Sequence, residues 1–233
     1  MLPCFYTITM TAQEYFGDWM QVIPQKEMNE VLQKLKFVDK SVLCPEYKNI
    51  FKAFNKCPYR NLRLVVLGQD PYPQKDIATG IAFANKESTS EYELSPSLKV
   101  IKESVINYEV PHNLVTFAPT LEDWEEQGVL LLNTSLTCRV NESGSHSLLW
   151  RPFVSALLRN ISMDNTGIVF LLLGGSAKSF RECVGNNHYV ITEKHPSYYY
   201  RCHTKMPYTI WQSINDFLIK RDGYGINFYK EEL

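Results

Sequence analysis

The amino-acid sequence predicts an α/β protein of a single domain, with a central four-stranded, mainly parallel sheet flanked by helices on both faces. Three observations lead to this prediction. Two of four short apolar runs are continuous rather than alternating, which is typical of strands buried on both faces of a parallel sheet. Segments with helical spacing of apolar residues separate the runs. The 233 residues, 45% of them hydrophobic, suit one core, and no repeat or flexible linker divides them.

The candidate strands are residues 62–67 (LRLVVL), 129–132 (VLLL), 168–173 (IVFLLL) and 189–192 (YVIT). The longest wholly apolar run, 168–173, is far too short to cross a lipid bilayer, which takes about 20 apolar residues. We therefore expect a protein without a membrane-spanning segment.

Helix signals lie between and before these strands. Ser95-Pro96 supplies an N-cap and a first-turn proline for a helix over residues 97–108. Thr120-x-x-Asp123 has the spacing of a capping box before Trp124. Apolar residues at helical spacing predict the other helices, at residues 29–37, 47–54, 153–161, 177–184 and 208–219.

The charge balance excludes a protein that binds nucleic acid through its overall electrostatic field. Lys and Arg number 24 and Asp and Glu number 25, which gives a formal net charge of -1. DNA binding would therefore need a local basic patch. Residues 139–205 offer one, with eight Lys and Arg against four Asp and Glu, although such counts also fit an ordinary solvated surface.

Cysteine usage predicts a reduced, metal-free protein, and we expect no other cofactor. The six cysteines form no C-x-x-C pair and have no zinc-site spacing. The first basic residue is Lys26, so the N-terminus lacks the charged region that begins a secretory signal. We expect an intracellular location, which is the cytoplasm, or the nucleus if the source is eukaryotic or viral.

Polar residues follow each predicted strand, where ligands bind in open α/β sheets. Asp70 and Tyr72 stand in a loop that two prolines stiffen, and Asn133 follows the second strand. Gly174-Gly175-Ser176 opens a helix after the third strand, and His195 follows the fourth. Each also has a structural explanation, since Asp caps turns, Asn ties loop backbone, Gly-Gly-Ser makes tight turns, and a histidine beside proline is more often structural.

The sequence resembles the uracil-DNA glycosylases of the base-excision type. The stretches that carry the resemblance are residues 65–72 (VVLGQDPY), 79–84 (TGIAFA), 95–98 (SPSL), 128–139 (GVLLLNTSLTCR), 145–150, 167–174 (GIVFLLLG) and 195–197 (HPS). Their order and spacing match from about Arg63 to the C-terminus. Residues 1–60 match weakly, and we expect them to form a helical N-terminal part of one domain over residues 1–233.

The resemblance implies an enzyme that hydrolyses the N-glycosidic bond of a deoxyuridine in DNA. The nucleotide is flipped out of the helix before the bond is cleaved, and an abasic site remains. Asp70 matches the catalytic carboxylate that stabilises the sugar cation and orients water. His195 matches the histidine that donates a hydrogen bond to uracil O2 as the base becomes an anion.

The resemblance also implies how uracil is recognised. Gln69 matches a residue whose backbone helps to hold the base, and Phe83 matches the aromatic ring that stacks on it. Asn133 matches the amide that distinguishes uracil from cytosine through their opposite donor and acceptor patterns. Tyr72 matches the ring that blocks the C5 methyl group of thymine by a rigid clash.

The resemblance implies phosphate contacts at four further positions, and at a fifth position the sequence departs from the family. Ser97, Gly175, Ser176 and Ser197 match phosphate-contact positions, and either Gly175 or Ser176 takes the role of the family's serine in that turn. Tyr199 stands where the family has a wedge leucine that enters the base stack, so we expect an aromatic wedge.

Pro73 replaces the usual histidine after the GQDPY stretch, which affects contacts of that loop with the DNA backbone. We expect a monomer that acts on single- or double-stranded DNA.

Two alternatives stay open. A non-catalytic DNA-binding or assembly module on the same fold is disfavoured because both Asp70 and His195 are retained. An unrelated nucleotide-binding enzyme is disfavoured further, since no G-x-G-x-x-G and no P-loop pattern is present.

Overall fold

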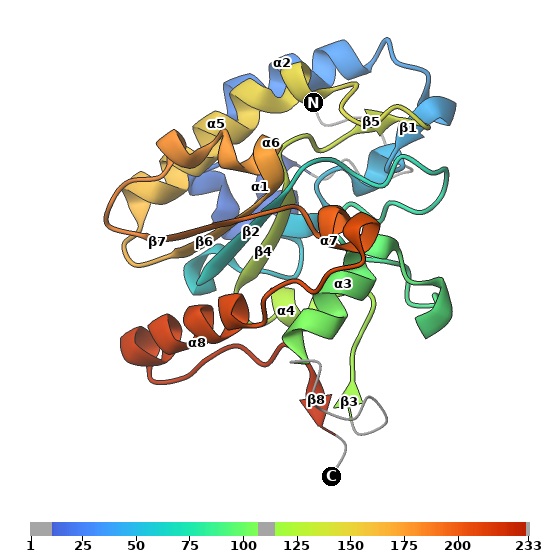
Figure 1. Ribbon diagram of the computed structural model, residues 1–233. Coiled ribbons are helices and arrows are strands. Elements are labelled where there is room, and N and C mark those ends of the chain that lie inside the picture. The colour runs from blue at the N-terminus through green and yellow to red at the C-terminus, as the bar shows by residue number, and fades with distance from the viewer. Residues whose placement is uncertain (1–10, 107–114, 232–233) are drawn as a thin grey trace.

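The computed structural model describes residues 11–106 and 115–231, and its centre is a parallel sheet (Figure 1). The strands have the order β4-β2-β6-β7 and are all parallel. Their bounds are β2 Leu64–Gly68, β4 Val129–Asn133, β6 Val169–Leu173 and β7 Tyr189–Glu193. The four-stranded parallel sheet predicted from the apolar runs is confirmed, with each strand within two residues of its predicted bounds.

Helices cover both faces of the sheet, as the sequence predicts (Figure 1). One face packs against α1 (Ala12–Phe16), α2 (Gln25–Leu35), α5 (Ser147–Asp164) and α6 (Gly174–Lys178). The other packs against α3 (Pro96–Val105), α4 (Glu122–Glu125), α7 (Pro196–Cys202) and α8 (Thr209–Asp222). Val65 and Leu67 of β2 point into the first core, and Leu64 and Val66 into the second. This alternation explains why the strand is apolar at every position.

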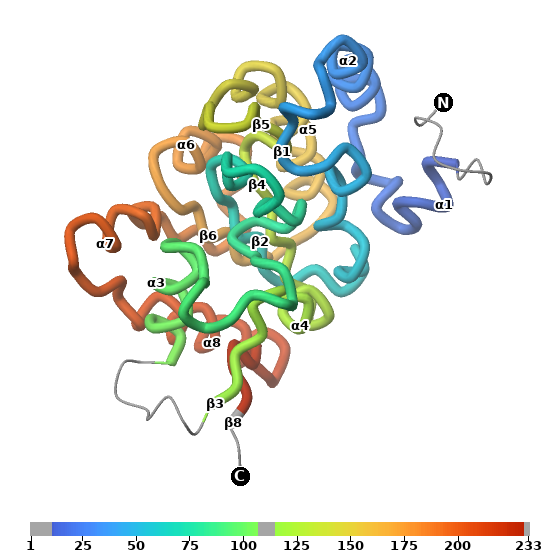
Figure 2. The backbone as a smooth tube through the Cα atoms, turned by 90° about the vertical axis from the view of Figure 1, so that its right-hand side faces the viewer, coloured from blue at the N-terminus to red at the C-terminus, as the bar shows by residue number. Residues whose placement is uncertain are grey.

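Two small antiparallel pairs lie outside the main sheet (Figure 2). β1 (Leu43–Cys44) pairs with β5 (Cys138–Arg139), and β3 (Val115–Thr116) pairs with β8 (Lys230–Glu231). The sequence does not predict them, because two residues are too few to show an alternating pattern.

Several predicted helices are confirmed with changed ends. α5 and α8 extend the predicted segments 153–161 and 208–219, and α2 begins four residues before the predicted segment 29–37. The predicted segment 97–108 corresponds to α3, and its residues 107–108 lie outside the described part of the chain.

Other helix predictions are wrong. Residues 47–54 form two 3₁₀ turns instead of one α-helix, because Phe51 and Phe54 both pack against Phe16 and tertiary contacts override helical propensity. The predicted helix 177–184 is split into α6, which begins at Gly174, and a 3₁₀ turn further on. The residue at the N-cap position of α4 is Leu121, in a left-handed conformation, and not Thr120.

One carboxyl group is enclosed by the core at the end of α4. Glu125 is fully buried, and neither of its side-chain oxygens has a hydrogen-bond partner among the described residues. Burial raises the pKa of Glu125 to about 9, so its carboxyl group keeps its proton at neutral pH. Across residues 11–106 and 115–231, no helix combines the length and the apolar composition needed to span a membrane.

Candidate active site

A cavity of about 590 Å³ opens at the carboxyl ends of β2 and β4 and beside the start of α7. It brings together most of the residues singled out in the sequence. Its lining includes both predicted catalytic residues, all four predicted base-recognition residues and two of the predicted phosphate contacts: Asp70, His195, Gln69, Tyr72, Phe83, Asn133, Ser97 and Ser197. Gly175, Ser176 and Tyr199 are not among its lining residues. Asp70 and His195 therefore line the same cavity.

Asp70 is held in place by a loop that lies 73 residues further along the chain. The hydroxyl of Ser143 and the backbone N–H of Gly144 both donate hydrogen bonds to Asp70 Oδ2, at 2.8 and 2.5 Å. Gln69 Nε2 donates in turn to Ser143 Oγ at 3.1 Å. Both bonds to Asp70 fall on one oxygen, and no hydrogen bond to Oδ1 occurs among the described residues. Oδ1 is therefore the oxygen available for water or a sugar cation.

The backbone carbonyl oxygen of Gln69 is bonded to the loop after β4. This oxygen accepts hydrogen bonds from Thr134 Oγ1 at 2.6 Å and from the backbone N–H of Ser135 at 3.0 Å. These bonds join the loop after β2 to the loop after β4, because neighbouring parallel strands end at the same edge of the sheet. The loop that carries Asp70 is thus fixed on both sides.

Tyr72 and Phe83 form one wall of the cavity. The Tyr72 hydroxyl donates a hydrogen bond to the carbonyl oxygen of Phe83 at 2.8 Å, and burial raises the pKa of the phenol. Phe83 has a φ of 68°, a left-handed conformation that is uncommon for a bulky side chain and is often found at functional sites. The phenol bond and the conformation together hold both rings in fixed positions.

Gly68, at the end of β2, leaves room for two residues of the cavity wall. A Cβ atom at this position would lie 2.5 Å from Asn133 Oδ1 and 2.8 Å from Phe83 Cζ, both closer than real contacts allow. Asn133 is the β4 partner of Gly68 in the sheet register. Its side-chain amide has no hydrogen-bond partner among the described residues, which leaves it free to pair with a base edge in the cavity.

His195 is the N-cap of α7, and its ring has a defined proton position. The backbone N–H of Ser197, which can only donate, points to His195 Nδ1 at 3.2 Å, and Ser197 Oγ lies 2.9 Å from the same atom. Nδ1 is therefore an acceptor, and the proton of the neutral ring is on Nε2. Burial, helped by the charge of Arg201, lowers the pKa of His195 to about 4, so the imidazole is neutral at physiological pH.

Gly174 allows this histidine to lie against the end of β6. Its φ is 91°, and a Cβ atom there would lie 2.9 Å from His195 Cβ. Gly175 next to it has open space where a side chain would project. Ser176 is the third residue of the short helix α6, and its carbonyl accepts a hydrogen bond from Ser179 Oγ at 2.7 Å. Gly174 thus serves packing, whereas Gly175 is exposed toward solvent.

The structure corrects the expectation of a wedge at Tyr199. This side chain is only 7% exposed, lies in the core beneath α7, and donates a hydrogen bond from its hydroxyl to Glu193 Oε1 at 2.6 Å. Residues 196–202 form a helix, so the middle tyrosine of the run turns inward. Tyr198 and Tyr200 are the exposed members, at 37% and 46%. An intercalating side chain has to be exposed, and Tyr199 is not.

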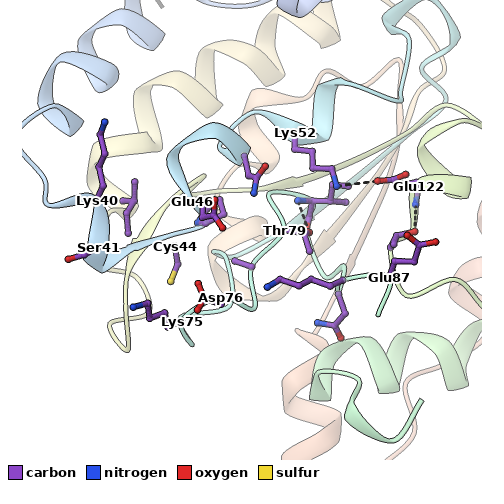
Figure 3. A pocket seen from close by; sticks show the side chains of 18 residues that line it. Lys40, Ser41, Cys44, Glu46, Lys52, Lys75, Asp76, Thr79, Glu87 and Glu122 are labelled. Carbon is purple, nitrogen blue, oxygen red and sulfur yellow. Dashed lines mark hydrogen bonds and ion pairs between the residues drawn. The ribbon is translucent and has the colours of Figure 1, made fainter. Parts of the chain in front are cut away.

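A second cavity, of about 510 Å³, lies behind the loop after β2 (Figure 3). It shares Ala78 and Ile81 with the first cavity. Its lining is a mixture of lysines and carboxylates, including the ion pair of Lys52 and Glu122 at 3.1 Å (Figure 3). It contains none of the residues predicted for catalysis, and the mixed charges provide no single chemistry.

Comparison with known proteins decides the family. The profile of the uracil DNA glycosylase superfamily matches residues 54–219. The chain belongs to the uracil DNA glycosylase superfamily. It is 35% identical over 193 residues to a uracil-DNA glycosylase of Fusobacterium nucleatum, covering 78% of this chain and 81% of the relative. It is 33% identical to a uracil-DNA glycosylase of Campylobacter jejuni, covering 82% of this chain and 84% of the relative.

Solved structures of glycosylases have the same fold. The mimivirus uracil-DNA glycosylase superposes with a TM-score of 0.69 at 21% identity, covering 93% of this chain and 91% of that one. The wild-type UNG of Nitratifractor salsuginis gives a TM-score of 0.58 at 19% identity, covering 92% of each chain. The superfamily resemblance expected from the GQDPY and HPS stretches is thus confirmed for family and fold.

Three features of the site were missed in the sequence. Ser143 and Gly144, which bond Asp70, belong to the stretch Asn141-Glu-Ser-Gly144. The residue types of this stretch indicate a turn, but they do not show that the turn contacts Asp70. The left-handed conformation of Phe83 has no sequence signal. Arg201 lines the cavity and bonds Ser197, whereas the sequence indicates only a surplus of positive charge there.

Proposed function

We propose that this protein is a uracil-DNA glycosylase, which hydrolyses the N-glycosidic bond of a flipped-out deoxyuridine and leaves an abasic site, the first step of base excision repair. The observation that carries this proposal is the single cavity that Asp70 and His195 both line, together with Tyr72, Phe83 and Asn133. Superfamily membership supports the same reaction.

The chemistry follows from the charges that develop as the bond breaks. The sugar becomes cationic and the departing uracil anionic. Asp70, fixed through Oδ2, presents Oδ1 to the sugar and to the attacking water. His195 presents Nε2–H, a neutral donor, to the oxygen on which the negative charge grows. Donors and acceptors that are already oriented stabilise such charges without rearrangement at the moment of reaction.

Base selection rests on the cavity wall. The side-chain amide of Asn133 pairs with the edge of uracil. Cytosine at the same place would leave buried polar groups unpaired, which favours uracil by a factor of about 10⁴. Tyr72, tied to Phe83 through its hydroxyl, blocks the space that a thymine methyl group would need. Phe83 stacks on the base, and Gln69 supports the loop that holds it.

DNA contacts are proposed around the same opening. Ser97, Ser197, Gly175 and Ser176 contact phosphates, and the exposed Tyr198 or Tyr200 supplies the aromatic wedge in place of Tyr199. We also propose that the protein acts inside the cell, as a monomer, on single- or double-stranded DNA.

The test is uracil release from synthetic oligonucleotides. The purified protein should release uracil from single-stranded, U·A and U·G substrates, leave T and C substrates intact, and keep its activity in a metal chelator. Asp70→Asn should lower the rate at least about a hundredfold. Asp76→Asn, the same chemical change in the same loop outside the cavity lining, is the matched control. DNA binding without base release on every uracil substrate would favour a non-catalytic module instead.

A further inference from the structure

Two cysteines on neighbouring short strands face each other. Cys44 of β1 and Cys138 of β5 are direct partners in an antiparallel pair, and both thiols are free. Directly opposite residues of such a pair have Cα atoms about 4.5 to 5.5 Å apart and side chains on the same face. Disulfides join residues whose Cα atoms lie about 4.4 to 6.8 Å apart. The strand pairing therefore gives these two thiols the placement that a disulfide needs.

Of the two thiols, Cys44 is the one that lines the second cavity, of about 510 Å³, where Figure 3 shows its sulfur beside Asp76. Cys138 is not among the residues that line this cavity, and its side chain is fully buried. Burial, followed by the charge of a nearby carboxylate, raises the pKa of both thiols, so the reactive thiolate is scarce. A small oxidant therefore reaches Cys44 first and reacts slowly.

Both thiols are bonded to the loop that carries Asp70. Cys138 Sγ donates to the carbonyl of Pro71 at 3.5 Å, and Cys44 Sγ donates to the carbonyl of Pro73 at 3.6 Å. The Pro71 carbonyl accepts from no other donor in the described part of the chain. The chemical state of the two sulfurs is thus coupled to the loop between the catalytic carboxylate and the second proline.

We propose that Cys44 and Cys138 are a redox-active pair, which a small peroxide such as hydrogen peroxide converts to a disulfide, and that this disulfide slows uracil release. Formation of the bond does not depend on the proposed function. Its effect on the rate rests on the proposed glycosylase function.

The oxidation proceeds in two balanced steps. The Cys44 sulfur attacks one oxygen of the peroxide, the O–O bond breaks, and a sulfenic acid on Cys44 and one water are formed. The Cys138 sulfur then attacks the sulfenic sulfur, the S–O bond breaks, and the hydroxide leaves as a second water with the proton of the Cys138 thiol. Two thiols together lose two electrons and two protons, and one hydrogen peroxide is reduced to two waters.

The disulfide affects the catalytic loop because it has no S–H donor. The Pro71 carbonyl loses its hydrogen bond, whereas the Pro73 carbonyl keeps the bond from the backbone N–H of Asn141. Asp70 also keeps the bonds to its Oδ2 from Ser143 and Gly144. We therefore expect a partial loss of activity, of about three- to tenfold, because the loop shifts at Pro71 and stays anchored on both sides.

The experiment treats the full-length protein in native buffer with hydrogen peroxide, alkylates the remaining thiols and maps disulfides by mass spectrometry of proteolytic peptides. The single-turnover rate of uracil release at saturating enzyme is measured before treatment, after it, and after reduction with dithiothreitol. Wild type should yield the peptide that links Cys44 to Cys138. Its rate should fall about three- to tenfold and recover on reduction.

Three variants identify the thiols that react. Cys44→Ala removes the first reacting thiol and should keep its own untreated rate after peroxide. Cys138→Ala leaves Cys44 without a partner, so a dimedone adduct of the Cys44 sulfenic acid should accumulate. Cys202→Ser, which changes the exposed thiol at the end of α7, is the matched control and should slow like wild type.

Absence of the linked peptide from treated wild type would overturn the proposal. A fully linked wild type with an unchanged rate would overturn the effect on catalysis, and an equal loss of rate in Cys44→Ala would assign that loss to another group. Failure of the untreated wild type to release uracil would refute the proposed function, and the peptide map would still decide whether the pair forms.

Discussion

Acidification from pH 7 to pH 5 is expected to destabilise this protein through His195. The folded chain holds this imidazole neutral because burial lowers its pKa to about 4, against about 6.5 for an exposed histidine. Between these two values the unfolded chain binds a proton that the folded chain does not. The contribution of His195 to the free energy of unfolding therefore falls as the pH falls through this window.

The magnitude follows from the size of the shift. The whole pKa shift corresponds to a contribution of about 3 kcal/mol to the free energy of unfolding. About 2 kcal/mol of this contribution is lost at pH 5, and all of it is lost only below pH 4. The assay is urea unfolding of wild type and His195→Gln at pH 7 and pH 5. Wild type should lose about 2 kcal/mol more than the variant between these two values. The other histidines, including His146, are common to both proteins and cancel in this comparison.

The neutral state of the His195 ring also determines how the rate of uracil release depends on pH. The rate of uracil release should show no inflection near pH 6.5 from His195, since the ring is already neutral above about pH 5. Equal losses of stability in wild type and His195→Gln, or an NMR titration of His195 near its ordinary value, would refute the reasoning.

Three further predictions concern single side chains. Gly68→Ala should lower kcat/KM for a uracil oligonucleotide at least about tenfold, as measured by steady-state kinetics. The new Cβ would lie 2.5 Å from Asn133 Oδ1 and would displace either the Asn133 side chain or the Phe83 ring. Tyr72→Ala should give measurable thymine release, because it removes the ring that blocks the C5 methyl group, and a T·A substrate tests it. Glu125→Gln should remove a fall in the free energy of unfolding of about 1.4 kcal/mol per pH unit as the pH rises from 5 to 8, because the folded wild type keeps a proton that the unfolded chain releases. Urea unfolding of both proteins at several pH values measures this difference in slope, and equal slopes would contradict it.

The sheet and most of the candidate site could be predicted from the sequence. The runs 129–132 and 168–173 identify buried parallel strands because every position faces one of two cores. Since parallel strands end at one edge of a sheet, the sequence predicts that Asp70, Asn133 and His195 lie near one another.

The remaining features depend on contacts between distant residues. The Ser143 hydroxyl reaches Asp70 only because β5 pairs with β1 and brings residues 141–145 back over the loop after β2. Tyr199 is predicted as an exposed wedge because it stands where the family has a wedge leucine, and the run of three tyrosines does not show which ring faces inward. Once α7 forms, the middle ring has to face inward.

The anchoring of the loop after β2 has a consequence for how DNA is engaged. Cys138 Sγ contacts the Pro71 carbonyl at 3.5 Å, Asn141 N–H donates to the Pro73 carbonyl at 2.8 Å, and the Ser143–Gly144 clamp holds Asp70 between them. The carboxylate half of the cleft is thus assembled before substrate arrives. We therefore expect the loop after β2 to keep its conformation when a nucleotide enters the cavity, so that the carboxylate needs no rearrangement before the reaction.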